Sequence, residues 1–121
     1  MINELAKRVH ENAIEKGFFE KEKNIGEMLC IIHSEVSEAL EADRKDHHTT
    51  CNMNAMNGWV ADEDFGQNFA NQVKNTFEDE LADIMIRVMD LAAFKNIDIE
   101  AHIKAKMRYN SLREKYHGKK Y

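Results

Sequence analysis

Two pairs of acidic residues at helical spacing carry the strongest chemical signal in this sequence. Glu35 and Glu38 stand three residues apart in SEVSEAL, and Glu80 and Asp83 repeat that spacing in EDELADI. Each pair borders an apolar stripe, where repulsion between like charges and loss of hydration both cost free energy. Carboxylates that converge in this way either take up protons or bind a cation.

A helical projection places the two pairs in equivalent positions. At about 100° per residue, Glu38 lies at roughly 300° when Glu35 is set to 0°, and Asp83 lies at the same angle from Glu80. The apolar residues of both helices fall in one neighbouring arc, from roughly 20° to 120°. If the helices pack by these stripes, the four carboxylates converge at the rim of a shared core. The alternative interpretation of each pair is a solvated helix face.

The ligand type restricts the ion. All-oxygen ligation suits a hard cation, which predicts Mg²⁺, with Mn²⁺ as the alternative ion. Ca²⁺ fits less well because no helix-flanked loop carries its alternating acids. A di-iron bundle needs Glu-x-x-His, whereas Glu41 and Ile86 occupy the histidine positions. A zinc site is the weaker hypothesis, because only one arm of ligands is visible. That arm consists of His47, His48 and Cys51.

Apolar periodicity predicts four helices, at residues 2–16, 25–45, 73–95 and 98–116. Asp98 is the expected N-cap of the last helix. Residues of about 46–72 lose the rhythm, and we interpret them as a long loop insert with room for a short helix. The expected fold class is all-α, a four-helix bundle-like single domain over residues 1–121.

Composition limits the partners. A chain of 121 residues suits one small domain, so we expect a homodimer or homotetramer to complete the bundle. The net charge of −5 argues against a nucleic-acid partner. No window approaches the ~20 apolar residues of a membrane span, and no signal peptide is visible. With two cysteines and no disulfide framework we expect a cytoplasmic location, with Cys30 buried in its apolar run.

The order of these motifs resembles the MazG-like nucleoside triphosphate pyrophosphohydrolases. The first motif region corresponds to KGFFEKEKNIGEMLCIIHSEVSEALEADRK, the second to FEDELADIMIRVMDLA, and the basic C-terminal helix to KAKMRYNSLREKYHGKKY. The segment between the acidic motifs is longer here than in compact members. The resemblance implies an all-α fold and Mg²⁺-dependent hydrolysis of nucleoside triphosphates to monophosphate and pyrophosphate. The implied role is the removal of surplus or non-canonical nucleotides.

The resemblance also implies roles for individual residues. Glu38 is the candidate to hold or deprotonate a water molecule, although the sequence does not separate ligand from base. Lys106 and Asn110 would lie near substrate phosphate or sugar, and Arg113 shares their helix face, with a plain surface role as the alternative. The implied Mg²⁺ ligands are Glu35, Glu38, Glu80 and Asp83.

Four further residues have two interpretations each. His10 and Phe19 match a histidine-to-aromatic spacing that contacts the base in dCTP-type relatives, but His10 also fits a helix surface and Phe19 a packing role. Arg87 would anchor a phosphate or pair with the acids. Trp59 would cover a base or join a subunit contact.

Two other functions remain open from the sequence. One is a non-catalytic helical interaction or regulatory module that keeps the fold without turnover. The other is a phosphoribosyl-ATP pyrophosphohydrolase.

Overall fold

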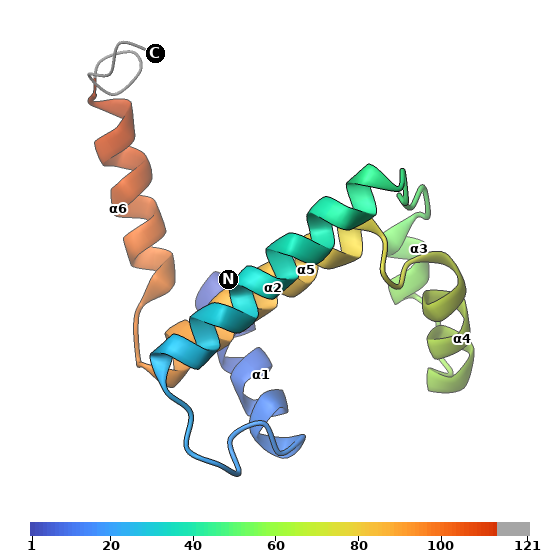
Figure 1. The fold of residues 1–121 in the computed structure, drawn as a ribbon, viewed down its shortest axis with the longest axis horizontal. Coiled ribbons are helices and arrows are strands. Elements are labelled where there is room, and N and C mark those ends of the chain that lie inside the picture. Colours follow the sequence, from blue (N-terminus) through green and yellow to red (C-terminus); the bar gives the residue numbers. More distant parts are fainter. Residues whose placement is uncertain (114–121) are drawn as a thin grey trace. The chain divides into compact units, whose positions relative to one another are not determined.

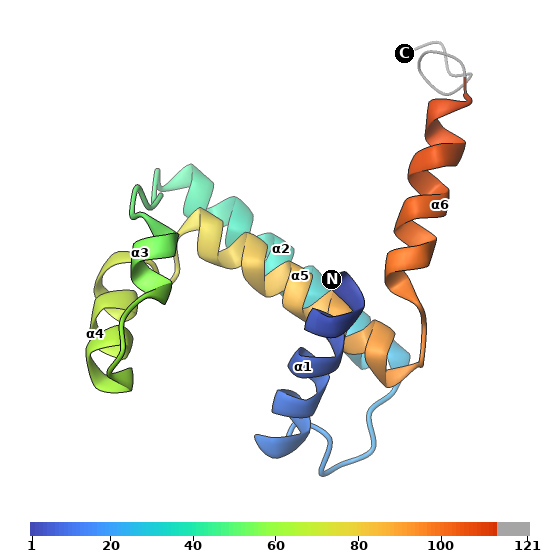
Figure 2. The ribbon, with the colours of Figure 1, turned by 180° about the vertical axis from the view of Figure 1, so that it is seen from behind.

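The computed structural model describes residues 1–113, which form six helices and no strand, so the predicted all-α class is confirmed (Figures 1 and 2). The elements are α1 Ile2–Glu15, α2 Ile25–Arg44, α3 Met53–Asn57, α4 Asp62–Gln72, α5 Phe77–Phe94 and α6 Ile99–Ser111. All four predicted helices are present, and three of them, α1, α2 and α6, begin within one residue of the predicted start. The predicted end of the last helix, near Tyr116, lies outside the described residues.

The chain divides into two compact units. One unit spans Lys23–Val88, and the other joins Met1–Glu22 to the chain from Met89 onward. Helix α5 contributes residues to both units. The single domain expected from chain length stays a prediction.

In the unit of residues 23–88, α2 and the first part of α5 run antiparallel, side by side (Figures 1 and 2). The side chain of Asn24 caps α2 by accepting the backbone N–H of Glu27 at 2.8 Å. Helix α5 starts at Phe77, four residues later than predicted, because Thr76 acts as an N-cap. Its Oγ1 accepts the N–H of Asp79 at 3.3 Å, and Asp79 Oδ2 accepts the N–H of Asn75 at 2.9 Å.

Only one edge of the apolar stripe of α2, which carries Met28 and Ala39, belongs to its buried face, and this corrects the packing assumed from periodicity. The large residues at the other edge of the stripe are about half exposed, and they lie roughly 100° around the helix from the centre of the buried face. The buried face carries Met28, Glu35, Ala39 and Ala42. The two alanines are small enough to allow close approach of a neighbouring helix, and the other edge of the stripe is left uncovered. Its exposed members on α2 are Ile25, Leu29, Val36 and Leu40, and α5 adds Leu81 and Met85.

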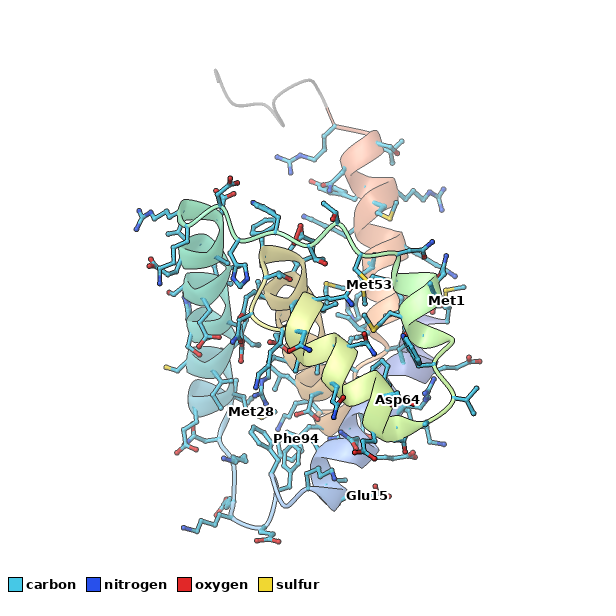
Figure 3. All side chains as sticks on the ribbon, turned by 90° about the vertical axis from the view of Figure 1, so that its right-hand side faces the viewer. Met1, Glu15, Met28, Met53, Asp64 and Phe94 are labelled. Carbon is cyan, nitrogen blue, oxygen red and sulfur yellow. The ribbon has the colours of Figure 1, made fainter. Side chains whose placement is uncertain are left out.

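The segment interpreted as a long loop contains two helices, α3 and α4. Asn52 caps α3 by accepting the N–H groups of Asn54 and Ala55. Helix α4 has three acids in its first turn and no fully buried residue. Its apolar spacing is limited to Phe65 and Phe69, whose ring centroids lie 5.8 Å apart, and this pattern is too short to identify a helix alone. Figure 3 shows both helices, with Met53 on α3 and Asp64 on α4 labelled.

In the other unit, α1 and α6 cap one another. Glu100 Oε1 accepts the N–H of Ile2 at 2.7 Å, and Asn3 Oδ1 accepts the N–H of Glu100 at 3.1 Å. Asp98 caps α6 as predicted, by accepting the N–H of Ala101 at 3.0 Å. These bonds satisfy backbone donors that a helix start leaves without partners.

Two predictions about exposure have different outcomes. Within residues 1–113, no helix is both long enough and apolar enough to cross a membrane. Cys30, expected to be buried, is exposed. It lies roughly 150° around α2 from the centre of the buried face, and it is also outside the arc of the apolar stripe.

Candidate metal centre

Carboxylates from α2 and α5 converge in the unit of residues 23–88. Ligand oxygens of Glu35, Glu38 and Glu80 lie within 4.8 Å of one another. Glu35 and Glu80 are buried, while Glu38 is exposed and so provides the open side of the group. Two residues come from α2 and one from α5, so the antiparallel packing of these helices creates the group.

Glu80 is the residue that distinguishes this group from a solvated acidic face. Its exposed fraction is 5%, and its Oε2 is buried without a hydrogen-bond partner. A buried carboxylate oxygen with no partner is costly, since folding removes its hydration without replacement. A divalent cation would provide that missing interaction, and an all-carboxylate set suits Mg²⁺ or Mn²⁺.

Burial and crowding change the protonation of this group. Burial, followed by the charge of Glu38, raises the pKa of Glu80 to about 7. Burial also raises the pKa of Glu35, aided by its hydrogen bond with Glu38 and the charge of Asp83. Without a cation Glu80 therefore keeps its proton up to about neutral pH.

Asp83 enters a second group rather than the first. Its carboxylate lies with those of Asp79 and Glu80, all within 4.8 Å, so Glu80 is shared by both groups. Burial, then the charge of Asp79, raises the pKa of Asp83. Asp79 was missed by the sequence reasoning, although its position next to Glu80 was a visible signal. The predicted set of four is thus distributed over two adjoining groups.

Arg87 lies beside the acids, with its Nε 3.5 Å from Glu35 Oε1. Its guanidinium counteracts the rise in the pKa of Glu35 and of Asp83. Of the two roles considered for Arg87, the structure records the pairing with acids. Anchoring of a phosphate stays a prediction.

Comparisons with known proteins do not assign a family. No family model, curated protein or solved structure matches the chain. The geometry of the carboxylates is therefore what supports a function, and the MazG-like resemblance stays a prediction.

The zinc hypothesis gains no geometric support. Within residues 1–113, the groups of three or more close ligand side chains are the two acidic ones, and neither includes His47, His48 or Cys51. Both ring nitrogens of His48 face carboxylates instead, Asp43 at 3.3 Å and Glu78 at 3.0 Å.

His10 and Phe19 belong to the other unit, where their rings pack together. Their centroids are 4.9 Å apart, and Phe19 stacks on Phe94 at 4.8 Å. His10 Nδ1 lies 2.8 Å from Oδ1 of Asp90, a carboxylate that is 3% exposed. The sequence reasoning missed Asp90, although an acid inside the apolar run MIRVMDLAAF was a signal. Base contacts by His10 and Phe19 stay predictions.

The basic residues of α6 are exposed in the same unit. Lys106 Nζ lies 5.3 Å from the ring centre of Tyr109, and the Arg113 guanidinium lies 5.5 Å from the same ring centre. Helix α6 ends at Ser111, so Arg113 lies beyond the helix face that it was expected to share with Lys106 and Asn110. Contacts of these three residues with substrate stay predictions, as does the role of Trp59, which is 48% exposed.

Proposed function

We propose that this protein is a Mg²⁺-dependent nucleotide pyrophosphohydrolase that cleaves nucleoside triphosphates to monophosphate and pyrophosphate. The observation that supports it most is the buried, unpartnered Oε2 of Glu80 within a group of three carboxylates. The resemblance of the sequence to MazG-like enzymes adds the reaction class.

The buried and the exposed carboxylates of the group would have different roles in this reaction. Buried Glu35 and Glu80 would hold the ion, and Asp83, which lies in the adjoining group with Glu80, would complete the ligand set. The ion, when bound, neutralises polyphosphate charge and lowers the pKa of a water molecule. Exposed Glu38 would orient that water and accept its proton at a carboxylate oxygen. Arg87 would keep the Glu35 carboxylate in place.

A nucleotide panel tests this proposal. Pyrophosphate release is measured with Mg²⁺ on canonical, deoxy- and modified triphosphates and on phosphoribosyl-ATP. We expect turnover of at least one triphosphate, with Glu38→Gln lowering kcat by about 100-fold or more, because the water loses its proton acceptor. Turnover confined to phosphoribosyl-ATP would support the alternative hydrolase. The absence of turnover on every substrate would contradict the proposal.

The exposed stripe favours one further candidate, a helical interaction module without catalysis. Six large apolar side chains on α2 and α5 are at least 44% exposed: Ile25, Leu29, Val36, Leu40, Leu81 and Met85. A stripe of this kind marks a contact with another protein. Enzyme and module differ in the panel above, since only the enzyme loses activity in Glu38→Gln.

We propose that a second copy of this chain covers the stripe and completes a helical bundle, as a homodimer or homotetramer. Leu29→Lys is expected to weaken self-association by ~10-fold or more, because it places a charge in a face otherwise removed from water. Sedimentation velocity over a concentration series measures this.

Ser34→Lys is the matched control. It adds the same charge to an exposed position of α2 that lies roughly 140° around the helix from Leu29. We expect it to associate like the parent. A monomeric parent, or equal association of both variants, would show that the stripe is not a contact between copies.

A further inference from the structure

The start of α5 is joined to the chain that follows α2. The backbone N–H of Phe77 donates to the carbonyl of His47 at 2.8 Å. Thr49 N–H donates to Glu78 Oε2 at 3.1 Å, and His48 Nδ1 lies 3.0 Å from Glu78 Oε1. Both oxygens of Glu78 are therefore engaged by the segment of residues 47–49. Glu78 precedes Glu80 by two residues in the first turn of α5.

His48 extends this junction to α2. Its Nε2 lies 3.3 Å from Oδ1 of Asp43, in the last turn of that helix. One imidazole ring thus lies between carboxylates of two antiparallel helices. The recorded neighbours of the ring are the charged groups of Asp43 from α2 and Glu78 from α5, and the uncharged ring of Phe77 at 5.2 Å.

The protonation state of the ring follows from this geometry. A carboxylate only accepts hydrogen bonds, so each ring nitrogen must carry a proton to interact favourably. A neutral imidazole has one N–H, and its other nitrogen would direct a lone pair at a carboxylate. The imidazolium form satisfies both contacts. Consistent with this, the hydrogen bond to Glu78, followed by smaller contributions from Asp43, raises the pKa of His48.

We propose that His48, as the imidazolium, is a positioning residue that joins the end of α2 to the start of α5 and so holds the turn that carries Glu80. The inference rests on the proposed function insofar as Glu80 is an ion ligand. Loss of the second proton from His48 releases one carboxylate, loosens the junction and weakens ion binding at the carboxylate group.

Mn²⁺ binding to the full chain at about pH 6 and about pH 8.5 tests this, on either side of the histidine titration. His48→Gln cannot donate to both carboxylates, while His48→Lys keeps a positive charge at both pH values. His47→Gln is the matched control, since it changes an adjacent, exposed histidine. All four proteins retain the ligand carboxylates, so proton competition at the ligands cancels in the comparison.

At about pH 6 we expect His48→Gln to bind Mn²⁺ ~2- to 5-fold more weakly than the parent, the range of an exposed ion pair. At about pH 8.5 the two should agree, because the parent ring is then neutral. His48→Lys should bind at least as tightly as the parent at both pH values, and His47→Gln like the parent. Equal weakening of His48→Gln at both pH values, or none at about pH 6, would overturn the proposal.

Ring ¹⁵N NMR separates this inference from the proposed function. The His48 ring should carry protons on both nitrogens, and Asp43→Asn should lower its titration midpoint. If no protein binds Mn²⁺ while Asp43→Asn shows this effect, the proposed function and the positioning of Glu80 both fail, and only the junction of α2 with α5 stands. An unchanged midpoint in Asp43→Asn overturns the junction itself.

Discussion

Glu80→Gln is expected to weaken divalent-ion binding by about 100-fold or more and to abolish turnover, while it stabilises the metal-free protein. Glu80 links both acidic groups, and its buried Oε2 has no partner. A neutral amide of the same shape removes the buried charge, so we expect ~1–2 kcal/mol of added stability at about pH 8. Calorimetric titration with Mg²⁺, pyrophosphate release and thermal unfolding measure the three effects.

Glu41→Gln is the control for this prediction. Glu41 is an exposed acid on the same helix as Glu35, and it pairs with Lys45 at 3.3 Å outside both groups. Because the pair is exposed, we expect ion binding, turnover and stability close to those of the parent. Normal ion binding in Glu80→Gln would exclude Glu80 as an ion ligand. Lower stability of its metal-free form would show that the buried charge of Glu80 does not destabilise the protein.

The metal-free protein is expected to lose stability as the pH rises from about 5 to about 8. The folded-state pKa of Glu80 is about 7, above the ordinary 4.5, so the native state binds this proton more tightly than the unfolded state. Its contribution is fully present below about pH 4.5 and is lost as the pH rises through 7. We expect a loss of ~2 kcal/mol in the free energy of unfolding, measured by urea titration with a chelator present.

The other groups with shifted pKa values do not oppose this loss of stability between about pH 5 and about pH 8. The raised pKa values of Glu35, Asp83 and His48 act in the same direction. The pKa of Glu100 is lowered to about 2 by the N-terminal amine, so its contribution is lost only at more acidic pH. Saturating Mg²⁺ should reverse the trend, because the ion binds the deprotonated carboxylates. A metal-free protein that gains stability between pH 5 and 8 would contradict this prediction.

The helices with regular apolar spacing could be predicted from the sequence, and the others could not. Periodicity located α1, α2 and α6 within one residue of their starts, because an apolar stripe marks a helix regardless of what it contacts. Helix α4 has only the short apolar pair Phe65 and Phe69 and an acidic first turn, which together were too weak a signal to predict a helix. The start of α5 depends on the Thr76 cap. Thr76 is visible in the sequence, but the apolar periodicity, which begins at Val73, placed the start four residues too early.

The candidate site followed from spacing only in part. The three-residue interval placed Glu35 and Glu38 on one side of α2. Their contact with Glu80 depends on how α2 packs against α5, which spacing along α2 does not predict. Periodicity suggested contact through the large apolar residues, but Ala39 and Ala42 lie on the buried face together with Glu35.

Asp79 joins Glu80 and Asp83 of the same helix, so its place in the second group could have been read from spacing. The contact of Asp90 with His10 is a tertiary one that spacing along one helix does not encode.

If the carboxylates bind an ion as proposed, the small size of Ala39 and Ala42 has a consequence for ionic selectivity. Oxygen atoms lie about 2.1 Å from Mg²⁺ and about 2.4 Å from Ca²⁺, so a modest change in the gap between backbones favours one radius over the other. These alanines lie on the buried face of α2 together with Glu35, so their small side chains would allow the backbones that carry the proposed ligands to stand close together. Bulkier side chains at either position would widen that gap and shift the preference toward the larger ion, without altering a single oxygen ligand.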